Sequence, residues 1–167
     1  MREARKPLAS VRATAIHMLA RREHSRAELS RRLVARGGDL QEIEGVLDAL
    51  EREGYLSDAR FAQTLVARKA ERFGKRAIAS AMRARGVDAD AAKEALRTLA
   101  DADEWVRARS AWARRFKAPA SDERARARQV RFLLARGYAL SVALKVVAGG
   151  DSNADSLSAP DPNASDD

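Results

Sequence analysis

The chain has 167 residues, no cysteine and a net charge of +8 from 32 basic and 24 acidic side chains. The absence of cysteine excludes a disulfide framework and thiolate chemistry and is typical of a reducing compartment, so we expect a cytoplasmic protein. Residues 1–10 are basic and lack the apolar run of a secretory signal, and no stretch approaches the roughly 20 apolar residues of a membrane span, so we expect no membrane association.

Apolar residues at helical spacing predict three helices in the first repeat, residues 11–56. These helices are expected at about 9–23, 26–36 and 40–53. Ser25 with Glu28, and Asp39 with Glu42, fit the capping box, in which two side chains satisfy free backbone donors at a helix start. The first repeat therefore has explicit signals for where its second and third helices begin.

The same pattern continues through a second repeat, residues 57–102, and a third, residues 103–148. The expected helices lie at about 58–72, 75–85, 89–100, 103–116, 122–136 and 140–148. Trp105, Trp112 and Phe116 share one helical face, which favours core packing. Tyr55, Tyr138 and both tryptophans could alternatively stack on nucleic-acid bases, but their helical spacing favours core packing for all four.

An Ala-Arg-Gly tripeptide closes the second helix of each repeat, with its glycine at position 37, 86 or 137. Glycine just past a helix adopts the left-handed conformation without a Cβ penalty, and the arginine before it suits the negative end of the helix dipole. A period of about fifty residues is typical of stacked helical units. The sequence thus predicts an all-α protein of three tandem three-helix repeats forming an elongated, curved array.

Residues 149–167 differ sharply in composition from the repeats. They are rich in Gly, Ser, Asn, Pro and Asp and contain one large apolar residue, Leu157. Such a segment buries too little apolar surface to offset the entropy of ordering, so we predict a disordered acidic tail. It serves either solubility or competition with an acidic partner for the basic surface.

Catalytic and metal-binding patterns are missing from the sequence. His17 and His24 have no neighbouring ligand set, which favours ordinary histidines over a zinc site. No phosphate-binding glycine-rich loop and no nucleophile elbow is present. We therefore expect a protein that is not an enzyme and needs no cofactor or metal.

Basic side chains are the remaining candidates for function. Pairs of them recur near the end of the first helix of each repeat, and more follow along the second helices of the later repeats. The candidates are Arg21, Arg22, Arg68, Lys69, Lys75, Arg76, Arg83, Arg85, Arg114, Arg115, Arg128, Arg131 and Arg136. They form either a solvated face or a surface for a polyanion, or for a protein bound to one.

Three segments, read in order, resemble the bacterial regulatory protein family RecX. They are Gly-Tyr-Leu-Ser-Asp-Ala-Arg-Phe-Ala at 54–62, Ala-Arg-Gly-Val-Asp at 84–88, and the arginine-rich stretch 123–138. The resemblance covers about residues 11–148. It implies tandem three-helix repeats and a modulator of RecA, the recombinase that polymerises on single-stranded DNA. RecX proteins lie along the RecA filament, bridge its subunits and restrain its extension, ATP hydrolysis and strand exchange.

The sequence departs from this family at two places. Gly38 stands where an apolar residue is usual, and the Phe73-Gly74-Lys75-Arg76 loop is shorter than the usual glycine-rich basic stretch. Besides a monomeric RecA regulator, the residues allow two further functions. One is a DNA-binding module in its own right, and the other is a helical-repeat scaffold for a different acidic protein.

Overall fold

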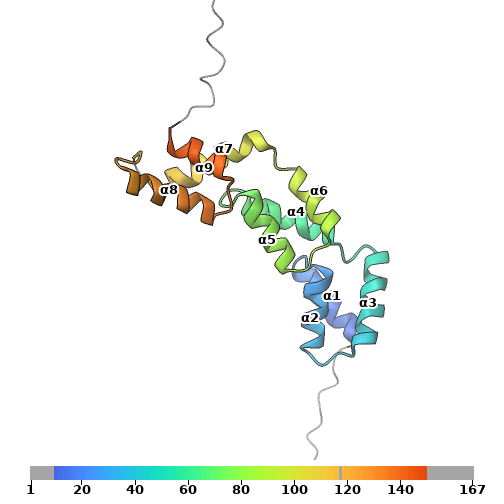
Figure 1. Ribbon diagram of the computed structural model, residues 1–167. Helices are drawn as coiled ribbons and strands as arrows, with labels where there is room; N and C mark the ends of the chain where they lie inside the picture. Colours follow the sequence, from blue (N-terminus) through green and yellow to red (C-terminus); the bar gives the residue numbers. More distant parts are fainter. Residues whose placement is uncertain (1–9, 117, 150–167) are drawn as a thin grey trace, which may run out of the picture.

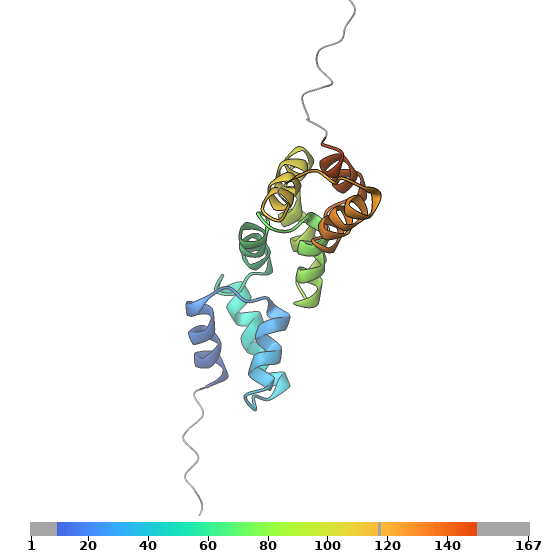
Figure 2. The ribbon, with the colours of Figure 1, turned by 90° about the vertical axis from the view of Figure 1, so that its left-hand side faces the viewer.

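The computed structural model describes residues 10–116 and 118–149, and within these ranges the regular structure is entirely helical. Unit 1 contains α1 (Val11–Arg21), α2 (Arg26–Val34) and α3 (Leu40–Arg52). Unit 2 contains α4 (Asp58–Lys69), α5 (Lys75–Ala84) and α6 (Ala89–Arg97), and unit 3 contains α7 (Asp101–Ala113), α8 (Glu123–Ala135) and α9 (Leu140–Val147). The units follow one another along an elongated, curved path (Figures 1 and 2), which confirms the predicted architecture.

Apart from Ser10 and Gly149, the basic N-terminal segment and the acidic tail lie outside the described residues. Within the described ranges, none of the helices combines the length and apolar character that crossing a membrane requires.

Each helix ends one to three residues earlier than the sequence predicts. The residues involved form capping turns, such as the turn in which the Arg72 N–H donates to the Lys69 carbonyl over 3.0 Å. The first helix also begins later than expected, because Ser10 is its cap and accepts the Ala13 N–H over 3.2 Å. Apolar periodicity continues through such turns, so it does not mark a helix end closely.

Every unit has its own buried core. Leu29 and Leu47 lie in the core of unit 1, Ile78 and Met82 in that of unit 2, and Leu133 in that of unit 3. In each of the helix pairs that pack most extensively, both helices come from one unit, as in α4 with α6 and α7 with α9. The units are therefore separate small bundles, and what fixes their arrangement is the contact between neighbours.

The aromatic residues of unit 3 pack into or against its core, as the helical spacing predicts. Tyr138 is fully buried, and burial raises the pKa of its phenol. Trp112 is partly buried and donates its indole N–H to Gln129 over 2.9 Å, while the rings of Phe116 and Phe132 meet edge to face at 5.1 Å. The same prediction is wrong for Tyr55, because 55% of its surface is exposed in the turn after α3.

The three Ala-Arg-Gly segments adopt the same helix end. Their glycines have φ values of +86°, +67° and +80°, and the next N–H donates to the carbonyl five residues earlier. This is the Schellman motif, in which an apolar residue usually follows the glycine. Val87 and Tyr138 fill that position in units 2 and 3, whereas a Cβ at Gly38 would lie 3.0 Å from Ile43 Cδ1. In unit 1 the Ile43 side chain therefore occupies the space that the missing side chain would fill.

We expect Ala139→Asp to stabilise unit 3. Asp39 and Asp88 cap α3 and α6 by accepting two backbone N–H groups each, but Ala139 caps α9 without any side-chain bond. Its φ and ψ of −64° and 149° match those of Asp39, at −68° and 136°, so a carboxylate fits the site. The gain should be about 0.5–2 kcal/mol of unfolding free energy, measured by urea denaturation followed by tryptophan fluorescence. Ala139→Asn is the control that separates the hydrogen bond from the charge, and unchanged stability in both variants would contradict the prediction.

Candidate binding surface

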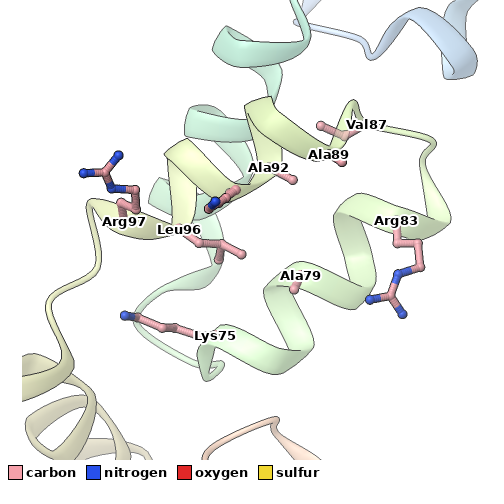
Figure 3. Close-up of a pocket in the computed structure, with 9 residues that line it drawn as sticks. Lys75, Ala79, Arg83, Val87, Ala89, Ala92, Leu96 and Arg97 are labelled. Carbon is pink, nitrogen blue, oxygen red and sulfur yellow. The ribbon is translucent and has the colours of Figure 1, made fainter.

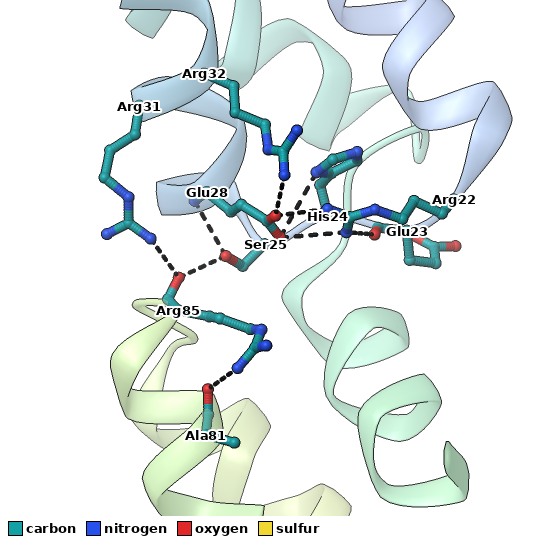
Figure 4. A network of polar contacts seen from close by, with 9 residues as sticks. All are labelled: Arg22, Glu23, His24, Ser25, Glu28, Arg31, Arg32, Ala81 and Arg85. Atoms are coloured by element: carbon teal, nitrogen blue, oxygen red, sulfur yellow. Dashed lines mark hydrogen bonds and ion pairs between the residues drawn. The ribbon is translucent and has the colours of Figure 1, made fainter. Parts of the chain in front are cut away.

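The second helices of adjacent units meet end to end. At the first joint, between units 1 and 2, Ser25 Oγ at the start of α2 donates to the Arg85 carbonyl at the end of α5 over 2.6 Å (Figure 4). At the second joint, between units 2 and 3, the Gly74 N–H at the start of α5 donates to the Arg136 carbonyl after α8 over 2.9 Å. The free carbonyls at the end of one second helix are thus satisfied by donors from the preceding unit.

Both joints depend on glycine. A Cβ at Gly86 would lie 2.6 Å from Ala27 Cβ, and one at Gly137 would lie 2.3 Å from the backbone N of Ala77. At Gly37, which has no unit before it, a Cβ would meet nothing within 4 Å. The sequence interpretation of the tripeptide as a helix cap is therefore correct but incomplete, because two of its three copies also form the contact between units.

Ion pairs balance the positive charges around the first joint. Arg22 pairs with Glu28 at 2.6 Å, and Arg60 pairs with Glu23 at 2.8 Å. Arg26 reaches three carboxylates at 2.5–2.8 Å, those of Glu44, Asp48 and Glu51. Burial lowers the pKa of Arg26, but the hydrogen bonds to these carboxylates outweigh it and raise the pKa. This part of the surface therefore presents little unbalanced positive charge.

Asp58 adds a second link across the first joint. Its two carboxylate oxygens accept the N–H of Arg26 and the N–H of Asp88, each over 2.8 Å. One side chain at the start of α4 thus ties the start of α2 to the loop before α6. Nothing in the spacing of the sequence indicates this contact, because its partners lie in different units.

We expect the stability of unit 1 to fall as the pH drops below about 6.5, the ordinary pKa of histidine. His24 is only 3% exposed, and burial and the charge of Arg22 lower its pKa despite the nearby Glu28 carboxylate. The folded protein therefore holds His24 neutral where the unfolded chain binds a proton, so protonation favours unfolding. Urea denaturation at several pH values measures this slope, and His24→Gln should reduce it. The control is His17→Gln, and an equal slope in the His24 variant would contradict the prediction.

Positive charges gather without such balance at the second joint. A groove of about 360 Å³ there is lined by Arg72, Arg114, Arg115 and Arg136 with Phe73, Phe132 and Ala111, and no acidic residue is among the described residues lining it. The Arg136 guanidinium lies 3.8 Å from the centre of the Phe132 ring, and the Lys69 ammonium 4.6 Å from that of Phe73. We call Lys69, Arg72, Arg114, Arg115 and Arg136 the cationic cluster.

Contacts within and between units hold three members of the cationic cluster, Lys69, Arg114 and Arg136, in place. Arg114 donates to the Glu71 carbonyl over 2.6 Å, which ties the end of α7 to the turn after α4. The rings of Phe73 and Phe132 support the cations above them while leaving their charges in place. A set of cations fixed in this way is suited to a phosphate or a carboxylate, since little side-chain freedom remains to be lost on binding.

The structure separates the residues that the sequence groups together. Lys69, Arg114, Arg115 and Arg136 meet in the cationic cluster, while Lys75 and Arg83 line a different groove, between α5 and α6. Arg21 and Arg22 lie in unit 1, and Arg85 is half-buried at the first joint. The other candidates, Arg68, Arg76, Arg128 and Arg131, are exposed on α4, α5 and α8.

Arg72 lines the groove at the second joint but is not among the candidates that the sequence pattern predicts. It lies three residues after Lys69 and directly before Phe73, in the turn that leads to the second joint. The sequence does contain a signal for Arg72, since it lies beside Phe73 and close to the basic pair Arg68-Lys69. The pairs at 21–22, 68–69 and 114–115 occupy equivalent positions in the sequence, but their electrostatic surroundings differ.

The fold and this surface define an all-helical tandem-repeat protein with an arginine-rich groove between two of its units. Within the part of the chain that the structure describes, no group of three His, Asp or Glu side chains could hold a metal ion.

Comparisons with known proteins identify the family. Models of the first, second and third three-helix domains of RecX match residues 12–50, 57–96 and 102–147. The regulatory protein RecX of Leptothrix cholodnii is 44% identical over 146 residues, which cover 87% of this chain and 92% of that protein. The regulatory protein RecX of Ralstonia nicotianae is 42% identical over 88% of this chain and 91% of its own length. The chain therefore belongs to the RecX family of regulatory proteins.

The fold agrees with solved structures of the same family. The crystal structure of RecX from Lactobacillus salivarius matches with a TM-score of 0.71, covering 83% of this chain and 93% of that one. At 17% identity, this similarity bears on the fold alone.

Proposed function

We propose that this protein binds the RecA filament on single-stranded DNA and restrains filament extension, ATP hydrolysis and strand exchange. The observation that carries the proposal is the match of all three units, in order, to the three RecX domains. The protein acts by binding as a monomer, without a catalytic step of its own.

The structure supports this proposal physically. Three units in a curved row can contact successive subunits of a filament, which a single compact bundle of this size cannot reach. The cationic cluster offers unbalanced positive charge to acidic side chains of the filament or to DNA phosphates. We therefore place the contact with the filament at the joint between units 2 and 3, where the cationic cluster lies.

The test is ATP hydrolysis by RecA on single-stranded DNA, with the purified protein added at increasing ratios. We expect inhibition at ratios well below one protein per RecA subunit, because a protein that restrains extension acts on many subunits at once. No effect until the DNA is fully coated would instead indicate simple competition for DNA and would contradict filament regulation.

A second candidate function, DNA binding in its own right, is favoured by the pairing of arginine with phenylalanine in the cationic cluster. Cations track the phosphates and rings stack on bases in proteins that bind single strands. Affinity for bare DNA would then fall steeply with salt. Salt-independent inhibition of RecA alongside weak DNA binding would exclude this candidate.

A further inference from the structure

A groove between α5 and α6 combines an apolar floor with a basic rim. It has a volume of about 480 Å³, its floor includes Ala79, Ala92 and Leu96, and its rim carries Lys75, Arg83 and Arg97 (Figure 3). Lys93 also lines this groove. Among the described residues lining it, none is acidic. Arg97 pairs with Glu94 at 3.0 Å, and Lys75 has an interaction of its own, so Arg83 and Lys93 are the cations most available to a ligand. Such a groove suits an acidic segment with a single large apolar side chain.

Other grooves among the described residues suit an acidic segment with an aliphatic side chain less well. The groove beside α1 is lined by Asp39 and Glu42, and the groove at the first joint by Glu44, Asp58 and Asp88. The groove at the second joint is basic, but its apolar lining is mainly the rings of Phe73 and Phe132, and the Arg136 guanidinium lies over Phe132. The groove between α5 and α8 has an aliphatic side chain, Leu134, but Arg76 is the one cation among the described residues lining it. Charge and floor together favour the α5–α6 groove.

The sequence of this chain contains a segment with the complementary chemistry. Residues 150–167 carry five aspartates and no basic residue, and their one large apolar residue is Leu157. Asp155 and Asp161 flank Leu157 on either side. With Leu157 on the apolar floor, the flanking carboxylates would lie beside the basic rim.

The segment is long enough to reach the groove. The Arg76 N–H donates to the Gly137 carbonyl over 3.3 Å, so one end of α5 lies against the chain just before α9. Helix α9 has eight residues and is about 12 Å long. The chain from Gly149 to Leu157 spans up to about 26 Å when extended, which exceeds the return distance along α9.

We propose that residues 150–167 dock in the α5–α6 groove of the same molecule, with Leu157 on its floor and the aspartates at its rim. The attachment gives the segment an effective concentration in the millimolar range, so a weak contact is sufficient. In this position it covers Arg83 and Lys93 and competes with any acidic partner or polyanion for them. The docking is independent of the proposed function, and RecA is not needed to detect it.

The test uses the full chain with a spin label. The protein has no cysteine, so Ser158→Cys gives a single attachment site next to Leu157. We expect the label to broaden the amide NMR signals of Ala79, Ala92 and Leu96 at low salt and to leave Ile43 in unit 1 unaffected. High salt should remove the broadening, because it screens the contact.

Two pairs of variants make the test specific. Arg83→Glu with Lys93→Glu should abolish the broadening, whereas the control Arg36→Glu with Arg52→Glu makes the same charge change on unit 1 and should retain it. Leu157→Ser keeps every tail charge and should weaken the broadening, because it removes the side chain that occupies the apolar floor. Circular dichroism confirms that each variant is folded.

Three outcomes would overturn the proposal. Signals of Ala79, Ala92 and Leu96 that stay sharp would show that the groove is empty, and equal broadening of unit 1 would show attraction to basic surface in general. Broadening of isotope-labelled protein by unlabelled, spin-labelled protein would show that a second copy supplies the tail. If the proposal holds, deleting 150–167 should also raise affinity for a polyanion such as heparin by up to about tenfold at low salt.

Discussion

Replacing Gly137 with alanine should uncouple unit 3 from the rest of the protein. The residue has φ +80°, and an added Cβ would lie 2.3 Å from the backbone N of Ala77. A left-handed alanine costs about 1–2 kcal/mol, and overpacking a close contact costs about 1–3 kcal/mol, so the sum is about 2–5 kcal/mol. Because each unit has its own core, we expect this loss of free energy to weaken the contact between units 2 and 3 and to leave the cores of both units intact.

Both tryptophans of the chain lie in unit 3, which makes this prediction measurable. During urea denaturation, tryptophan fluorescence follows unit 3, while far-ultraviolet circular dichroism follows all the helices. In Gly137→Ala the fluorescence midpoint should fall below the circular-dichroism midpoint, since unit 3 loses the support of its neighbour. If the fluorescence and circular-dichroism midpoints of Gly137→Ala both equal the midpoint of the parent protein, the joint contributes little to stability.

Two further glycines separate the causes of this effect. Gly37→Ala imposes the same left-handed penalty at φ +86° but meets nothing within 4 Å, so it should cost about 1–2 kcal/mol and leave unit 3 unchanged. Gly74 has an ordinary φ of −76°, but its Cβ would lie 2.4 Å from the Gly137 carbonyl oxygen. Gly74→Ala should therefore cost about 1–3 kcal/mol through the clash alone. Equal effects of all three substitutions would contradict the role of the joint.

Removing two members of the cationic cluster should weaken binding strongly. Arg115→Ala with Arg136→Ala deletes two unbalanced charges, while the Arg136 carbonyl that accepts the Gly74 N–H remains. We expect inhibition of RecA to require about 10 to 100 times more protein, equivalent to about 1.4–2.8 kcal/mol. If the cluster contacts single-stranded DNA directly, the slope of log affinity against log salt should also fall by about 1.4.

The matched control is Arg36→Ala with Arg52→Ala, which removes the same charge from unit 1. Arg36 and Arg136 occupy the same position in the repeated tripeptide, so the comparison tests location rather than residue type. The control should inhibit RecA like the parent protein. Equal losses in both double variants would indicate that net charge, not the cationic cluster, governs binding.

Helix starts were predictable because their signals are local. Ser25, Asp39 and Asp88 accept the backbone N–H groups expected of them, and the helices they cap begin at the expected residues. The Glu28 carboxylate was predicted to complete a capping box, but it pairs instead with Arg22 at 2.6 Å and Arg32 at 3.2 Å. A charged partner at short range is a better ligand for a carboxylate than a single backbone N–H.

The candidate site was less predictable, because residues at equivalent positions in the repeats have different neighbours in the folded protein. Arg22 and Arg115 both lie near the end of the first helix of a unit, yet Arg22 faces Glu28 while Arg115 lines a groove without acids. The difference comes from residues elsewhere in the chain, such as Phe132. Periodicity identifies the repeated arginines but contains no information on what lies opposite each of them.

The sequence by itself determined the number of units, their helices and the family, because helical periodicity, capping and glycine helix ends are properties of short segments. Only the tertiary structure showed that Gly86 and Gly137 form the joints, that Asp58 links the first of them, and that positive charge is balanced at one joint and not at the other. The reason is physical: close approach and charge balance depend on atoms brought together from different units, and no local pattern specifies them.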